Sequence, residues 1–153
     1  MVALCSVKNS PEHSLDQSET ELAINNVQQF IDRYPQSYLI DSCNQIIDQL
    51  QFKLETKQYD QVKLYDRMEN YKAAVAAGEM FLEGHGQSDF AEEINYVVVK
   101  NSYFLTINSI ESKKSERFEQ TNERFRTFVL RHPQSKYSKE LSSYLDKLSE
   151  NNN

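Results

Sequence analysis

Few residues that could carry catalytic chemistry are present, and none has the spacing of a catalytic motif. The histidines are His13, His85 and His132, and the sequence contains no HExxH, GxSxG or glycine-rich phosphate-binding motif. The neighbouring carboxylates Glu92 and Glu93 could support acid–base catalysis only inside a cleft, which nothing in the sequence indicates. We therefore expect no catalytic residue, no cofactor-binding residue and no metal site, and we predict that the chain is not an enzyme.

The two cysteines, Cys5 and Cys43, could not hold a small secreted scaffold together, and they lack the CxxC spacing of metal sites. We expect both to be small buried helical residues. His85 and His132 both follow a phenylalanine by four residues and come directly before a glycine or a proline. This position predicts that both histidines lie in turns.

Composition and charge limit the class of protein. The chain has 153 residues with only three glycines and three prolines, which favours helices over sheets and fits one domain over residues 1–153. Its formal net charge of −6 argues against nucleic acid as a partner, because a phosphate-binding surface needs clustered Lys and Arg. No apolar run is long enough to cross a bilayer, and the N-terminus lacks the pattern of a signal peptide.

One turn motif occurs three times and organises the chain. In each copy, a Phe is followed four residues later by a Tyr or His, and directly after that by a Pro or Gly, a Gln and a Ser. The serines recur with a period of about 50 residues. The three copies are Phe30-x3-Tyr34-Pro35-Gln36-Ser37, Phe81-x3-His85-Gly86-Gln87-Ser88 and Phe128-x3-His132-Pro133-Gln134-Ser135. Pro or Gly would end the preceding helix, Gly through left-handed dihedrals, and each serine is predicted to be the N-cap of the next helix. Such a repeat predicts stacked helical hairpins.

The apolar spacing between these turns predicts six helices. They are expected at 19–33, capped by Asp16 or Ser18, and at 37–68, 71–82, 88–109, 116–131 and 135–148, with a polar connector at 111–116. The helix at 37–68 is too long for one small hairpin, so we expect its two ends to pack in consecutive repeats. Residues 2–9 resemble the end of a helix whose beginning is missing, which suggests that the chain is a fragment of a longer protein.

The helix at 71–82 contains Gly78 among several alanines. Glycine costs about 1 kcal/mol relative to alanine inside a helix. We therefore expect a second helix to pack closely against Gly78.

Several short motifs, in their order along the chain, resemble the BamD family of outer-membrane assembly lipoproteins, also called YfiO or ComL, and in particular its Bacteroidetes members. The resemblance extends over residues 3–148. It rests on Ser10-Pro11 with Leu15-Asp16-Gln17, on Ala23-Ile24-x2-Val27-Gln28-x-Phe30-x3-Tyr34-Pro35-x-Ser37, on Lys63-Leu64-Tyr65 and on Tyr71-Lys72-Ala73-Ala74.

The resemblance implies an all-α tetratricopeptide-like solenoid of about three repeats, which would be the C-terminal part of a longer stack. The chain would lack the signal peptide, the first repeats and the N-terminal lipid anchor, through which alone it would associate with the membrane. The family is not enzymatic and lies on the periplasmic face of the outer membrane. Its partners are the barrel subunit BamA, bound through POTRA domains, and unfolded outer-membrane proteins.

For the partner-binding surface we select four residues near the start of the helix at 71–82: Arg67, Glu69, Asn70 and Lys72. They could equally be ordinary solvated side chains. A second function is a tetratricopeptide-like periplasmic adaptor for another protein or peptide, for which a groove lined by Asn and Lys would be evidence. A third, an all-α enzyme, would need a deep pocket with converging titratable groups.

Overall fold

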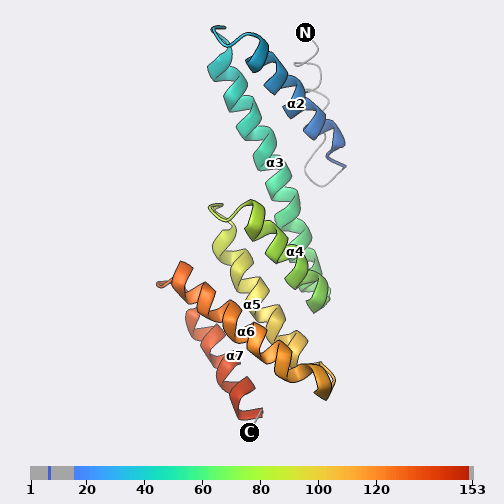
Figure 1. The fold of residues 1–153 in the computed structure, drawn as a ribbon, viewed down its shortest axis with the longest axis vertical. Helices are drawn as coiled ribbons and strands as arrows, with labels where there is room; N and C mark the ends of the chain where they lie inside the picture. Colours follow the sequence, from blue (N-terminus) through green and yellow to red (C-terminus); the bar gives the residue numbers. More distant parts are fainter. Residues whose placement is uncertain (1–6, 8–15, 152–153) are drawn as a thin grey trace. The chain divides into compact units, whose positions relative to one another are not determined.

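The computed structural model describes residue 7 and residues 16–151, and the predicted helix end at 2–9 lies almost entirely outside them, as do Cys5 and His13. The described residues form six α-helices and no strand (Figure 1). The helices are α2 (Ser18–Arg33), α3 (Ile40–Arg67), α4 (Tyr71–Gly84), α5 (Ala91–Ile107), α6 (Glu111–Arg131) and α7 (Ser138–Asn151). The predicted all-α fold of helical hairpins is confirmed, including the long helix α3 of 28 residues.

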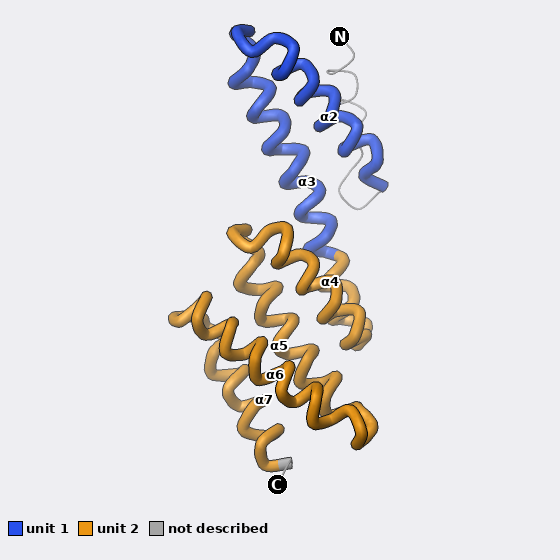
Figure 2. The backbone as a smooth tube through the Cα atoms, in the orientation of Figure 1, with its two compact units in different colours: residues 1–60 blue, residues 61–153 orange. Residues whose placement is uncertain are grey.

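The chain divides into two compact units, residues 1–60 and 61–153 (Figure 2). Helix α3 contributes residues to both units, because the division falls at residue 60 within it. Each unit has its own buried residues and is described separately below. The prediction of one domain over 1–153 stays a prediction.

The first unit contains α2 and the first part of α3. Ala23 and Val27 of α2 are buried, as are Ile47 and Leu50 of α3, so each helix buries residues three or four positions apart. The N-cap of α2 is Gln17 and not the predicted Asp16 or Ser18. Ser18 is the first helical residue, and its backbone N–H donates a hydrogen bond of 3.1 Å to Asp16, which lowers the pKa of that carboxyl group.

The second unit is built around α5. This helix packs against α4, α6 and α7 (Figure 1), and it buries residues on nearly every side. Val99 of α5, Phe128 of α6 and Leu141 of α7 form one buried cluster, at 1%, 0% and 0% exposure. Four partly buried aromatic residues pack against this cluster: Tyr96, Phe125, Tyr137 and Tyr144.

Two tyrosines of this aromatic layer share one carboxylate. Tyr96 of α5 and Tyr144 of α7 donate hydrogen bonds of 2.9 and 2.8 Å to Glu140 Oε1. Burial, followed by the hydrogen bond to Glu140, raises the pKa of Tyr144 to about 12 and raises the pKa of Tyr96 further. Both hydroxyl groups therefore stay protonated far above neutral pH, and they tie α5 to α7.

Gly78 allows α4 to approach α5 closely, as predicted. A Cβ atom at this position would overlap Cγ2 of Val98, and it would lie 3.6 Å from Ile94 Cγ2 and 3.7 Å from Val62 Cγ1. Gly78 is itself buried. An alanine here would have to push Val98 aside, and a β-branched side chain in a helix has little rotamer freedom with which to move.

The three predicted turns have the same geometry. In each, the Phe ring lies 5.1–5.4 Å from the ring four residues later, whose backbone carbonyl accepts the serine N–H at 3.0–3.1 Å. The serine hydroxyl then accepts the N–H two residues on, at 3.0–3.2 Å. The Phe, the second ring and the Ser are Phe30, Tyr34 and Ser37 in the first turn, Phe81, His85 and Ser88 in the second, and Phe128, His132 and Ser135 in the third.

Two details of the predicted turns are wrong. The serines are not N-caps, because α3, α5 and α7 each begin three residues after the serine. A further turn intervenes, in which Ile40, Ala91 and Ser138 each donate a backbone hydrogen bond to the serine carbonyl. The second turn does not use left-handed glycine dihedrals either, since no glycine has positive φ.

The predicted polar connector at 111–116 is also wrong, because α6 begins at Glu111. Ile110 directly before it is extended, and the Lys113 N–H donates to the Ile110 carbonyl at 2.9 Å. Lys114 forms a 2.5 Å ion pair with Glu111 within the first turn. The segment lacks apolar residues, so apolar spacing could not reveal it, but Glu and Lys are good helix formers.

Candidate functional site

The four predicted partner-binding residues lie at the α3–α4 turn, and all four are exposed. Glu69 takes a left-handed conformation with φ of 54°, unlike any other non-glycine residue described. Asn70 caps α4, because its side-chain oxygen accepts the Ala73 N–H at 3.3 Å. Glu69 and Asn70 thus have structural roles in the turn, whereas partner binding by the four residues stays a prediction.

A polar network lies at the end of α3, next to this turn. The Asp66 carboxylate accepts hydrogen bonds from Lys100 Nζ at 2.8 Å and from Asn101 Nδ2 at 2.7 Å. Asn101 is fully buried in α5, so the network fixes the end of α3 to the central helix of the second unit. These hydrogen bonds therefore hold in place the backbone from which the exposed residues of the α3–α4 turn extend.

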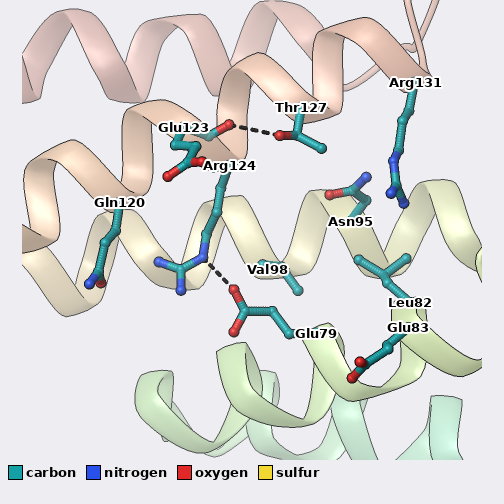
Figure 3. A pocket seen from close by; sticks show the side chains of 10 residues that line it. All are labelled: Glu79, Leu82, Glu83, Asn95, Val98, Gln120, Glu123, Arg124, Thr127 and Arg131. Atoms are coloured by element: carbon teal, nitrogen blue, oxygen red, sulfur yellow. Dashed lines mark hydrogen bonds and ion pairs between the residues drawn. The ribbon is translucent and has the colours of Figure 1, made fainter.

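A groove lies between α4 and α6, with α5 as its floor (Figure 3). Its volume is about 500 Å³. Glu79, Leu82 and Glu83 line it from α4, Asn95 and Val98 from α5, and Gln120, Glu123, Arg124, Thr127 and Arg131 from α6.

The groove continues toward the N-terminal ends of α4 and α6. A second hollow of about 300 Å³ shares Glu79, Gln120 and Arg124 with the first and extends to Lys72 and Lys113. One ion pair joins the two walls, with Arg124 Nε 2.7 Å from Glu79 Oε1. The structure thus places Lys72 on the groove, whereas Arg67, Glu69 and Asn70 line neither hollow.

The charge of the groove differs from that of the whole chain. Glu79, Glu83, Glu116 and Glu123 provide its carboxylates. Its five basic side chains outnumber these four carboxylates by one: Lys72, Lys113, Arg117, Arg124 and Arg131. The chain as a whole has 17 Lys and Arg against 23 Asp and Glu. The basic excess lies in the second hollow, because the first hollow has three carboxylates against two arginines.

Two donors in the groove have no acceptor among the described residues. Asn95 is 4% exposed, and its Nδ2 makes no hydrogen bond there. Arg131, the last residue of α6, makes no ion pair within the same part of the chain. Figure 3 shows its side chain running from the end of α6 into the groove that Asn95 also lines. The Asn95 amide nitrogen thus has no partner although it is buried, whereas the Arg131 side chain is exposed to solvent.

Sequence analysis did not identify this site. Asn95 directly precedes Tyr96-Val97-Val98-Val99, and its burial depends on how α6 crosses α5. Arg131 ends a charged helix and looks like any solvated residue in the sequence. The predicted repeat implied that α4 and α6, as equivalent helices of consecutive repeats, run parallel to each other. This was the available signal that their facing residues line one groove.

Residues 7 and 16–151 contain neither a cluster of metal ligands nor a membrane-spanning helix. No three His, Cys, Asp or Glu side chains in this part of the chain gather as metal ligands. None of the helices described is long and apolar enough to cross a membrane.

Comparison with protein-family models relates the chain to a known family. A family model described as YfiO, outer membrane lipoprotein, matches residues 53–151, which is more than half of the chain. No curated protein matches the chain. The matched residues include all of α4–α7, both hollows of the groove and the α3–α4 turn.

Proposed function

The chain belongs to the YfiO family of outer membrane lipoproteins, and we propose that it is a non-enzymatic scaffold of the outer-membrane β-barrel assembly machinery. In this role it binds the POTRA domains of the barrel subunit BamA and supports the folding and insertion of outer-membrane proteins. The observation that carries the proposal is the family match, which covers the helical hairpins of the second unit.

The proposed contact surface is the α3–α4 turn, with Arg67, Glu69, Asn70 and Lys72. All four side chains are exposed, and the Asp66 network and the Asn70 cap fix their backbone. A surface that is ordered before binding loses less conformational entropy on association. The proposed location is the periplasmic face of the outer membrane, where unfolded outer-membrane proteins would be the second class of partner.

A titration of this chain with the POTRA domains encoded in the same genome tests the proposal. We expect binding, and we expect the double variant Arg67→Glu and Lys72→Glu to weaken it. The matched control reverses Arg126 and Lys139, two exposed basic residues of α6 and α7 that line neither hollow of the groove.

Binding that survives reversal of Arg67 and Lys72 would keep the function and discard the surface. If the chain shows no binding to the POTRA domains, the scaffold proposal is wrong. A tetratricopeptide-like periplasmic adaptor for another protein or peptide would then be the function to test.

A further inference from the structure

The second hollow, at the N-terminal ends of α4 and α6, has more positive than negative charge. Four basic side chains line it against two carboxylates: Lys72, Lys113, Arg117 and Arg124 against Glu79 and Glu116. Arg124 and Glu79 pair with each other at 2.7 Å, which leaves three cations and one carboxylate. Lys72 and Lys113 form no ion pair with any described residue. The hollow is therefore a positively charged place in a chain whose formal net charge is −6.

Exposed apolar side chains lie beside this hollow, in the turn between α5 and α6 (Figure 1). Ile110, directly before α6, is 68% exposed, and Ile107, the last residue of α5, is 38% exposed. Leu105 of α5 lines the hollow itself. The Lys113 backbone N–H donates to the Ile110 carbonyl at 2.9 Å, which fixes the basic residue one helical turn from the isoleucine. The α5–α6 turn thus presents apolar and basic side chains next to each other.

We infer that the α5–α6 turn and the second hollow contact a membrane surface that contains anionic phospholipids. Exposed isoleucines can enter the boundary between headgroups and acyl chains, while lysine and arginine bind the phosphates at the surface. The long apolar stems of Lys113 and Arg117 suit this position, because they can lie along the boundary with their charged ends among the headgroups. A soluble anion would match the charge of the hollow but would leave Ile107 and Ile110 uncovered.

The family of the chain makes such a contact useful. Its members are outer membrane lipoproteins, so a membrane surface is within reach of the helical hairpins. A single acyl chain gives only marginal membrane binding, whereas an acyl chain combined with a basic surface gives stable binding. A contact through the α5–α6 turn would also fix the orientation of the second unit on the membrane. The inference rests on the family and goes beyond the proposed binding of POTRA domains.

Vesicle binding and a tryptophan reporter test the inference. The complete 153-residue chain is titrated with vesicles of phosphatidylglycerol and phosphatidylcholine in equal parts, and separately with vesicles of phosphatidylcholine alone. Because the sequence contains no tryptophan, Ile110→Trp introduces a single fluorophore at the proposed contact. Leu130→Trp is the matched control, since Leu130 is 83% exposed near the other end of α6 and lines neither hollow.

We expect the chain to bind the anionic vesicles about tenfold more tightly than the phosphatidylcholine vesicles, and to lose this preference in about 0.5 M salt. The emission of Ile110→Trp should shift to shorter wavelength on binding, and that of Leu130→Trp should not. Lys113→Glu should weaken binding about tenfold, because it replaces a positive by a negative charge at the membrane surface. Lys139→Glu, an equal charge change on exposed α7 surface outside both hollows, should preserve binding.

The variant Lys113→Glu should fold, because Lys113 is exposed and a carboxylate is favourable in the first turn of a helix. Equal binding of the two kinds of vesicle, or no binding of either, would overturn the inference. So would equal losses for Lys113→Glu and Lys139→Glu, or an unshifted emission of vesicle-bound Ile110→Trp. The POTRA titration contains no lipid, and these variants keep Arg67 and Lys72, so failure of either experiment leaves the other result unaffected.

Discussion

Replacing Gly78 by alanine should destabilise the second unit, although alanine is the better helix former. The helix propensity gained is about 1 kcal/mol. Overpacking typically costs about 1–3 kcal/mol, and here the new Cβ would overlap a methyl group of Val98, which is 2% exposed. The cost therefore exceeds the gain, and we expect a net loss of about 1 kcal/mol in the free energy of unfolding.

Gly84 provides the matched control in the same helix. A Cβ at Gly84 would meet no atom within 4 Å. Gly84→Ala should therefore leave the stability unchanged or raise it by a fraction of about 1 kcal/mol. Urea unfolding should show a loss of stability for Gly78→Ala and no loss for Gly84→Ala.

A double-mutant cycle identifies the contact responsible. Val98→Ala removes the methyl group that the new Cβ would overlap. In that background, Gly78→Ala should no longer destabilise the protein, which corresponds to a coupling energy of about 1–2 kcal/mol. If Gly78→Ala stabilised the protein as much as Gly84→Ala does, with no coupling to Val98, the close packing of α4 on α5 would be refuted.

Two further predictions concern the repeated turns and the aromatic layer. Phe128→Ala should lower the free energy of unfolding by about 3–5 kcal/mol, because Phe128 is fully buried. Phe30→Ala should lower it by less in the same urea titration, because Phe30 is only half-buried. Equal losses for the two variants would contradict this expectation. The hydrogen bond and burial that raise the Tyr144 pKa to about 12 stabilise the fold below pH 10. This contribution should disappear as the pH rises from about 10 to about 12. Glu140→Gln should lower the pKa of Tyr144, as followed by tyrosinate absorbance, and an unchanged titration would show that Glu140 does not contribute.

The sequence predicted the helices well where apolar spacing or a turn motif marked them. The three turns repeat one chemical pattern, so their common geometry was predictable, and Gly78 was correctly associated with close packing. The start of α6 was missed because its first turn is entirely polar, and the serine positions were wrong because an extra turn separates each serine from its helix.

The groove was not predictable in the same way. Asn95 and Arg131 come from different helices, and neither belongs to a motif. The burial of Asn95 depends on the crossing of α4 and α6 over α5, which local spacing does not specify. The half-burial of Phe30, in contrast to Phe128, likewise depends on which helices cover each turn.

The central position of α5 has a consequence for the order in which the second unit can assemble. During synthesis the α4–α5 hairpin emerges first, and Val99 stays uncovered until Phe128 and finally Leu141 have followed. At roughly 5–20 residues per second, this interval lasts roughly 2–8 s. Over that time the nascent chain exposes an apolar helix face of the kind that chaperones bind. The α6–α7 hairpin therefore completes the second unit and also ends the period in which the nascent chain is at greatest risk of aggregation.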